Sequence, residues 1–273
     1  MNFLGKIVGY PSRYDASLLQ SIPRSFQRTS LNIREDNLPF CGTDFLTHYE
    51  ISYLLDSGKP VVGILSIEAP ANTPFLVESK SLKLYFNSLN MHRFPNSQSF
   101  LDLVQKDLDQ AYGSQVFLQF FQPQDFSAQK IQEFSGMNLD SLEIELPADF
   151  PYLPSPSLLV VEPSEKEVKE TWYSHLLKSN CLITGQPDWA SVQISYQGPK
   201  INPESLLKYL IAFRQHQEFH EHCVERIFMD ILNYCRPVQL SVFGRYTRRG
   251  GIDINPFRST QPEKVVNVRH ARQ

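Results

Sequence analysis

A cysteine and an aspartate share one short polar stretch, and together they could carry out nucleophilic chemistry. In KSNCLITGQPDWA (178–190), Cys181 lies seven positions before Asp188. A thiol needs a lowered pKa or a nearby base before it acts as a nucleophile, and a carboxylate could take its proton. Gly185 and Pro187 favour a loop that folds back and brings both side chains together. From spacing alone, a small buried thiol beside a turn explains the stretch equally well.

Histidines cluster around residue 220 and raise the question of a metal site. HQEFHEHC (216–223) places His216 and His220 at i, i+4, with His222 and Cys223 adjacent. The segment is not H-E-x-x-H, because Val224 stands four positions after His220. It offers no compact set of three ligands, and we predict no metal.

The elements that must position these residues follow one pattern, which begins in the first half of the chain. Alternating apolar residues predict a hairpin of strands 48–55 and 61–67 across the turn DSGKP. Helices are predicted around 79–90 and over 97–112, with Gly113 as a stop. A strand over 115–121 follows.

The second half repeats the pattern. Strands are predicted near 170–180 and over 192–196, and a helix begins at Asn202-Pro203. A second helix carries the apolar residues of 224–232, and the last predicted strands are 238–242 and 252–254. We therefore predict an α+β fold of two modules, each a four-stranded antiparallel sheet with two helices on one face. Open sheet edges must be paired or covered, so we expect the modules to pair and the chains to oligomerise.

The composition is that of a globular chain. Of 273 residues, 41% are hydrophobic and 20% charged, and the net charge of −3 argues against a nucleic-acid partner. No stretch approaches the length of a membrane span, and the opening MNFLGKIVGYPSRYD lacks the apolar run of a secretory signal. The four cysteines form no C-x-x-C pair and are expected to be reduced, in a cytoplasmic protein.

The segment ESKSLKLY (78–85) resembles the signature of the QueF family: Glu, Ser or Leu, Lys, Ser or Ala, a hydrophobic residue, Lys, Leu or Tyr, and an aromatic. KSNCLITGQPDWA is similar to the catalytic loop of this family, EFHEHCVERIF (218–228) to its substrate-binding helix, and YTRRGGIDINP (246–256) to its cofactor-contacting turn. The resemblance covers nearly the whole chain and fits the bimodular subgroup. It implies tandem tunnelling-fold (T-fold, ββααββ) modules over 1–140 and 141–273.

The resemblance also implies an activity: NADPH-dependent reduction of the nitrile of 7-cyano-7-deazaguanine to 7-aminomethyl-7-deazaguanine, on the route to the tRNA nucleoside queuosine. Cys181 would add to the nitrile carbon and form a thioimidate, a better hydride acceptor, and Asp188 would carry the proton. Two NADPH would be consumed per turnover without a metal. A cytoplasmic homodimer is expected.

The family pattern assigns the substrate residues. Glu78 and Glu221 would accept hydrogen bonds from the pyrimidinone edge, because one carboxylate can bind a ring N–H and an adjacent amine. The backbone at Val77 and Ser79 would line the same pocket, and His220 would contact the substrate. Phe219 could close over the base, or be a helix-core aromatic. By residue type alone, Glu78 could equally be a helix-start acid and Glu221 a solvated helix residue.

Basic residues at two places would bind NADPH. Lys80 and Lys83 are three apart and share a helix face, and RRGG (248–251) is a basic, glycine-rich turn. Ser79, Lys80, Arg249 and Gly250 are the expected contacts, and a grip on the 2′-phosphate would favour NADPH over NADH. The absence of G-x-G-x-x-G excludes Rossmann-type binding. Solvated charges and an ordinary hairpin turn would explain the same residues.

Two other classes of function are alternatives: a hydrolase on the same scaffold, either a metal-dependent GTP-cyclohydrolase-like or a nitrilase-like enzyme, and a silent purine-binding module. A reductase oxidises NADPH only with the nitrile, a hydrolase releases acid, amide or formate without a cofactor, and a binder does neither. The first half keeps Cys41 but has no loop like 178–190. We therefore expect one active site per chain, with Glu78 and Lys80 reaching Cys181 across the module interface.

Overall fold

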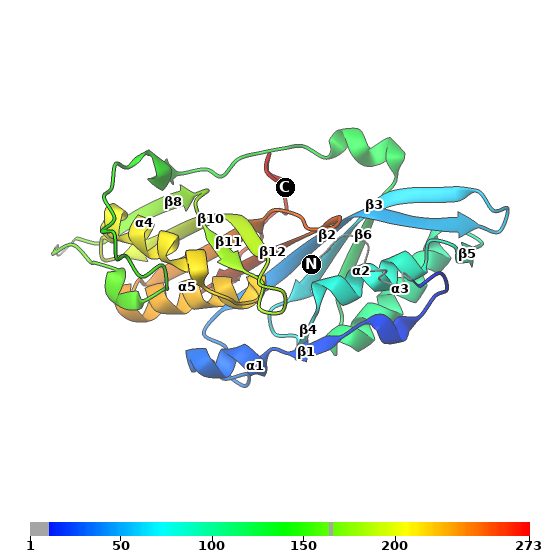
Figure 1. The fold of residues 1–273 in the computed structure, drawn as a ribbon, viewed down its shortest axis with the longest axis horizontal. Helices are drawn as coiled ribbons and strands as arrows, with labels where there is room; N and C mark the ends of the chain where they lie inside the picture. The colour runs from blue at the N-terminus through cyan, green and yellow to red at the C-terminus, as the bar shows by residue number, and fades with distance from the viewer. Residues whose placement is uncertain (1–10, 164–165) are drawn as a thin grey trace, which may run out of the picture.

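The computed structural model describes residues 11–163 and 166–273, and a single sheet runs through both halves of this part of the chain (Figure 1). The strand order is β6-β3-β2-β12-β11-β10-β8-β7. Its long strands pair antiparallel, and only the short strands β5 and β7 pair parallel to a neighbour. The first ten residues lie outside the described residues. They include the start of the predicted first module and most of the opening segment, which we do not expect to be a secretory signal.

The first half contains the predicted hairpin, longer than expected at both ends. Its two strands are joined at Gly58, whose φ of 84° suits the turn, and β2 carries a bulge between His48 and Ile51. The elements of this half are β2 (Cys41–Leu55), β3 (Pro60–Pro70), β4 (Phe75–Val77), α2 (Ser79–Ser88), β5 (Arg93–Phe94), α3 (Ser97–Tyr112) and β6 (Phe117–Phe121).

Helix α3 begins and ends where the sequence predicts. The Asn96 side chain accepts a hydrogen bond from the Ser99 N–H, which caps the helix start. Gly113 adopts the left-handed conformation that ends the helix. The predicted apolar face is buried, with the exception of Leu101, which is only half-buried; its buried members are Phe100, Val104, Leu108 and Ala111.

The first half does not contain four long strands, and that prediction is wrong for the described residues. Strand β6 ends at Phe121, and Pro123 starts the 3-10 helix Pro123–Ala128. Proline lacks the N–H that a continuing ladder would need, and Gln122 and Asp125 fix the new turn with a capping box. Only β2, β3 and β6 are long strands of this half.

The second half has the predicted four antiparallel strands. The segment near 170–180, predicted as one strand, is divided into β8 and β9, because the Asp140 carboxylate accepts hydrogen bonds from the Ser174 hydroxyl at 2.6 Å and the His175 N–H at 2.8 Å. The elements are β8 (Val168–Ser174), β9 (Lys178–Asn180), β10 (Pro187–Gly198), α4 (Pro203–Ile211), α5 (His220–Cys235), β11 (Gln239–Tyr246) and β12 (Ile252–Ser259), with β7 (Met137–Asn138) at the edge.

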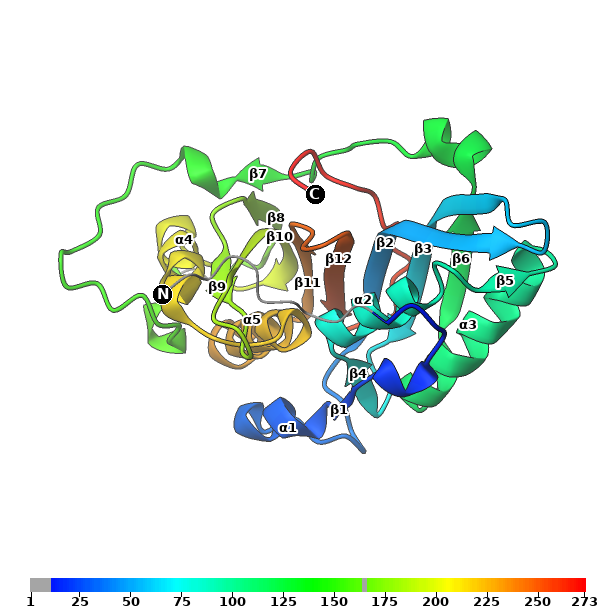
Figure 2. The ribbon, with the colours of Figure 1, turned by 45° about the vertical axis from the view of Figure 1, so that its right-hand side comes forward.

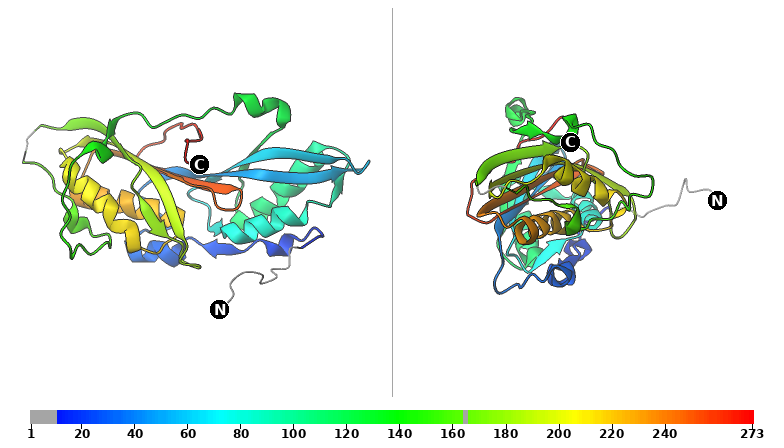
Figure 3. Two further views of the ribbon diagram at one scale, coloured as in Figure 1. Left: turned by 45° about the horizontal axis from the view of Figure 1, so that its top comes forward. Right: turned by 90° about the vertical axis from the view of Figure 1, so that its left-hand side faces the viewer.

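The two halves join through their sheets, as expected from their open edges. Strand β12 pairs with β2 in register from Ile252 opposite His48 to Ser259 opposite Cys41, which places β2 and β12 at the centre of the molecule (Figure 2). The α-helices cover one face of the sheet (Figure 3). The C-terminus and the first part of the segment that connects the halves run along the other face, and the later part of that segment returns to the helices, where Pro156–Leu158 contacts α4 and α5. Within 11–163 and 166–273, no helix is long and apolar enough to cross a membrane.

A buried ion network ties the N-terminal segment, β1 (Ser21–Pro23) and α1 (Ser25–Arg28), to the sheet and α5. Glu225 accepts hydrogen bonds from Arg28 at 2.6 and 2.9 Å and from Arg258 at 2.8 and 3.0 Å. Asp44 pairs with Arg258 and Arg24, each at 2.7 Å. All five side chains are at most 1% exposed.

Removing the Glu225 charge should destabilise the fold strongly. Glu225→Gln leaves two buried guanidinium groups without their shared anion, and we expect a loss of about 3–5 kcal/mol in the free energy of unfolding by urea. Glu204→Gln, at an exposed position of α4, is the control and should change it by less than about 0.5 kcal/mol. Equal unfolding midpoints for both variants would contradict the importance of the network.

The same carboxylate gives the network a pH dependence. Burial would raise the pKa of Glu225, but Arg258 and Arg28 outweigh burial and hold it well below its ordinary value of 4.5. The stabilisation is complete above that unfolded-state pKa and is lost as the pH falls towards the lower native pKa.

Candidate active site

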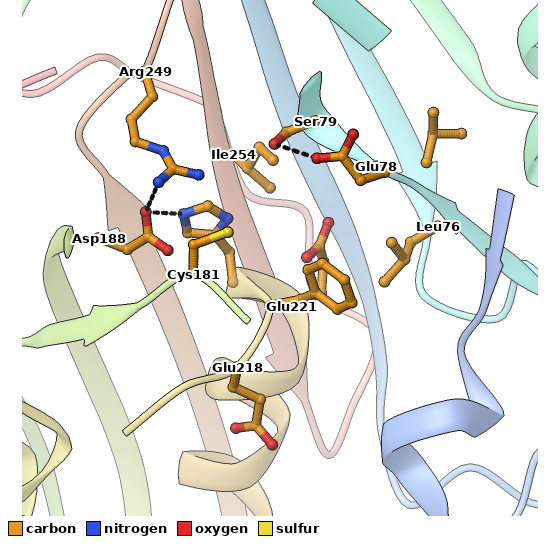
Figure 4. A pocket seen from close by; sticks show the side chains of 12 residues that line it. Leu76, Glu78, Ser79, Cys181, Asp188, Glu218, Glu221, Arg249 and Ile254 are labelled. Carbon is orange, nitrogen blue, oxygen red and sulfur yellow. Dashed lines mark hydrogen bonds and ion pairs between the residues drawn. The ribbon is translucent and has the colours of Figure 1, made fainter. Parts of the chain in front are cut away.

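The residues predicted to do chemistry meet in one recess between the two halves (Figure 4). The recess encloses a cavity of only about 10 Å³, room for about one water molecule, so its side chains must move apart to admit a larger ligand. The first half contributes the end of β4 and the start of α2, and the second half contributes the other lining residues. The lining residues are Leu76, Val77, Glu78, Ser79, Cys181, Asp188, Glu218, Phe219, His220, Glu221, Arg249 and Ile254.

The loop after β9 folds back as its glycine and proline predict. The Cys181 N–H donates to the Gln186 carbonyl at 2.8 Å, and the Gly185 N–H donates to the Cys181 carbonyl at 2.9 Å. Gly185 has a φ of 67°, a conformation that favours glycine. Asp188 then pairs with Ser179 across the strands, so Cys181 and Asp188 face the same recess.

Cys181 differs from the other thiols in its electrostatic environment. Burial raises the pKa of its thiol, but hydrogen bonds from Thr184 and Arg249 outweigh burial and leave the pKa below its usual value. Burial instead raises the pKa to about 12 at Cys223 and at Cys235, and raises that of Cys41. Only Cys181 is therefore shifted towards the thiolate, the nucleophilic form.

Asp188 is a buried carboxylate that lacks hydrogen bonds. It is 3% exposed, and neither of its oxygens accepts a hydrogen bond from the described residues. Its Oδ1 atom lies 3.2 Å from Arg249 Nη1 and 3.5 Å from His220 Nε2 (Figure 4). Since buried polar groups are normally satisfied, such a carboxylate is available to a proton or a ligand.

Glu78 caps helix α2, which agrees with its interpretation as a helix-start acid. Its carboxylate accepts hydrogen bonds from the N–H groups of Lys80 at 2.9 Å and Ser81 at 2.7 Å. It also lines the recess. Its Oε1 atom accepts a further hydrogen bond from the Ser79 hydroxyl at 3.4 Å, whereas Oε2 keeps a second lone pair for a ligand.

Glu221, the second residue of α5, is 4% exposed, so it does not lie on a solvated helix face. Burial, followed by the charge of Asp44, raises the pKa of its carboxyl group. A backbone hydrogen bond at Glu221 itself opposes part of this rise, and no side chain among the described residues donates to this carboxylate. It is therefore a second acidic group available to a ligand in the recess.

The other two residues predicted from the substrate-binding helix stand at its beginning. The ring of His220 packs edge-on against Tyr246, with centroids 4.2 Å apart. Phe219 is the N-cap residue of α5 and lines the recess rather than the helix core.

Glu218 was not predicted, because only tertiary contacts reveal its place. Its carboxylate binds Arg226 through two hydrogen bonds, at 2.8 and 3.1 Å, and His216 at 2.9 Å. The Glu218 N–H donates to the Asn180 carbonyl at 3.1 Å, which fixes the start of α5 beside Cys181. His222 Nε2 contacts the Arg24 carbonyl at 3.2 Å, and the described residues contain no group of three or more His, Cys, Asp or Glu able to hold a metal.

The basic turn predicted to contact a cofactor lies at the interface between the halves. Gly250 and Gly251 have φ of 55° and 80°, as a two-residue hairpin turn between β11 and β12 requires. A Cβ at position 250 would lie 1.4 Å from Lys83 Nζ, so the lysine of α2 packs directly on this turn. Lys80 is exposed at the start of α2, whereas Arg248 lies over the ring of Tyr49, 5.1 Å from its centroid.

The sequence matches two family models. Residues 10–120 match the N-terminal model described as nitrile reductase, 7-cyano-7-deazaguanine-reductase, and residues 187–265 match the model described as QueF-like protein. Together they span more than half of the chain. The chain therefore belongs to the QueF family of nitrile reductases.

Relatives of almost the same length support this assignment. The protein of Bordetella avium strain 197N named NADPH-dependent 7-cyano-7-deazaguanine reductase is 51% identical over 99% of this chain and 97% of its own length. Proteins of the same name from Polaromonas sp. and Ralstonia nicotianae are each 49% identical, with the same coverage. The solved apo structure of archaeosine synthase QueF-Like covers 37% of this chain and 99% of its own at 17% identity and a TM-score of 0.31, so family membership rests on sequence.

Proposed function

We propose that this chain reduces the nitrile of 7-cyano-7-deazaguanine to the primary amine 7-aminomethyl-7-deazaguanine with NADPH, a step towards queuosine in tRNA. The observation that carries the proposal is that Cys181, the one thiol with a lowered pKa, and Asp188, a carboxylate without hydrogen bonds, line the same recess as the family's motif residues.

The substrate is held by carboxylates from both halves. Glu221 and Glu78 accept hydrogen bonds from the ring N–H and exocyclic amine of the pyrimidinone edge. Hydrogen bonds from these donors to the buried Glu221 carboxylate would offset the free-energy cost of removing it from water. The backbone at Val77 and Ser79 borders the same site, and His220 contacts the substrate.

The chemistry begins with sulfur. Asp188 takes the Cys181 proton, the thiolate adds to the nitrile carbon, and Asp188 returns the proton to the nitrile nitrogen, which leaves a neutral thioimidate. When bound, NADPH supplies hydride, one per molecule, and two molecules are used in turn. After the first reduction the C–S bond breaks and releases the thiolate and an imine, and the second reduction gives the amine. The overall change consumes two hydrides and two protons.

The cofactor phosphates fit the basic turn at the interface. Lys83 fills the space over Gly250 that any side chain at that position would occupy. Ser79 and Arg249 line the recess, and Lys80 follows Ser79 at the exposed start of α2. Fixed cations and a glycine turn that allows close backbone approach suit a phosphate.

The assembly is part of the same proposal. Residues 1–140 and 141–273 form two modules of tunnelling-fold type, of which the first has three long strands instead of four in its described residues, and together they build one active site. The free edges at β6 and β7 favour pairing of two chains as a homodimer in the cytoplasm.

The proposal is tested by following NADPH absorbance with and without 7-cyano-7-deazaguanine. We expect oxidation only with the nitrile, two NADP⁺ per amine formed, and the same rate after treatment with a chelator. Release of carboxylic acid, amide or formate without NADPH would identify a hydrolase instead.

A further inference from the structure

The recess contains an imbalance of charge that the proposed reaction must overcome. Its lining has four carboxylates and a reactive thiol but one guanidinium, that of Arg249. The groups that face Cys181 are Glu78 before α2, Asp188 on β10, Glu218, His220 and Glu221 at the start of α5, and Arg249 on the β11–β12 turn.

The other carboxylates are balanced without Arg249. Glu218 is paired with Arg226 and His216, and Glu78 is engaged by the N–H groups of α2. Burial favours the neutral form of Glu221. Asp188 and Cys181 are the groups that remain, and they share the proton that the reaction moves.

Arg249 is aimed at these two groups by the backbone. The Arg249 N–H donates to the Ile252 carbonyl at 3.0 Å across the two-glycine turn, and the Thr247 N–H donates to the carbonyl of Trp189, the residue after Asp188, at 2.8 Å. The guanidinium therefore approaches Asp188 at 3.2 Å and is only 23% exposed. Its Nη1 atom is buried without a hydrogen bond among the described residues.

We propose that Arg249, besides contacting NADPH, is a positioning residue that stabilises the single negative charge shared by Cys181 and Asp188 before cofactor arrives. The inference rests on the proposed function. The guanidinium lies close enough to favour the charge whether sulfur or carboxylate carries it. A cation in a partly buried site interacts more strongly with a nearby negative charge than one in solvent, and its interaction with the shared charge does not need the cofactor.

The test measures the reactivity of Cys181 without nitrile or NADPH. Iodoacetamide alkylation of the peptide containing Cys181 is followed by mass spectrometry from pH 5 to 10. Arg249→Met should move the pH profile upward by about one unit, so that alkylation on the rising part of the profile is about tenfold slower at a given pH. Arg249→Lys, which keeps the charge but loses the planar fork, should fall between Arg249→Met and the unmodified protein.

Two further variants keep the outcome decisive. Lys83→Met removes a cation of α2 that packs on this turn but does not line the recess; it should raise the KM for NADPH and leave the alkylation profile unchanged. Arg249→Gln replaces Arg249→Met if the latter does not fold, as judged by circular dichroism. An unchanged alkylation profile in a folded Arg249 variant would overturn the inference. Failure of the unmodified protein to oxidise NADPH with the nitrile would instead overturn the proposed function.

Discussion

Cys181→Ala should abolish turnover, by about 10⁴-fold or more, while 7-cyano-7-deazaguanine still binds. Without the Cys181 sulfur no thioimidate can form, so the covalent route is lost. Hydride would then have to attack the nitrile directly. On the proposed function, binding is retained because Glu78 and Glu221 would hold the other end of the ring. Steady-state NADPH oxidation and calorimetric titration of the nitrile measure the two effects separately.

The matched control is Cys41→Ala, the same change at the thiol of the first half. Cys41 donates to the Ser259 carbonyl at 3.4 Å and does not line the recess, so its variant should keep its turnover. A Cys181→Ala protein that still forms a covalent adduct would show that another thiol is the nucleophile.

Asp188→Asn should reduce turnover by about 10²–10⁴-fold, the usual contribution of a general acid–base group. The amide keeps the shape of the side chain, but it neither accepts the thiol proton nor returns one to the nitrile nitrogen. The dissociation constant of the nitrile should change by less than about tenfold, because Asp188 does not hold the pyrimidinone edge.

The control for charge alone is Asp102→Asn, at an exposed position on α3. Adduct formation, measured in a stopped-flow instrument without NADPH, should slow in Asp188→Asn and not in Asp102→Asn. Equal rates of adduct formation in the two variants would remove Asp188 from the proton transfer.

Local signals predicted much of this fold because they depend on residues close in sequence. Helix α3 is set by Asn96, Gly113 and an apolar face, all within one segment. The 48–67 hairpin likewise follows from alternation and a turn. The fourth strand of the first half was wrongly expected by analogy with the second half, because the effect of Pro123 on the sheet edge outweighed the repeat.

Long-range contacts could not be predicted in this way. Arg28 and Glu225 are 197 positions apart, and no periodicity connects them. The exact pairing of β2 with β12 and the burial of Glu221 are also consequences of how the halves meet. These contacts determine where the recess forms and which of its charged side chains have a partner of opposite charge.

From residue types alone, Cys181 and Asp188 were as consistent with an ordinary loop as with a catalytic pair. The family resemblance selected the catalytic one, and the structure brings these residues together with Val77, Glu78, Ser79, His220, Glu221 and Arg249 in one recess. Lys80 and Lys83 lie outside its lining, and the packing of Lys83 on Gly250 could not be predicted without coordinates.

The most direct measurement is peptide mapping by mass spectrometry after the protein is mixed with 7-cyano-7-deazaguanine in the absence of NADPH. We predict a mass increase equal to one nitrile molecule on the peptide that contains residue 181, which disappears when NADPH is added and the amine is released. An unmodified peptide in a protein that then turns over, or a label on Cys41, Cys223 or Cys235, would contradict covalent catalysis by Cys181.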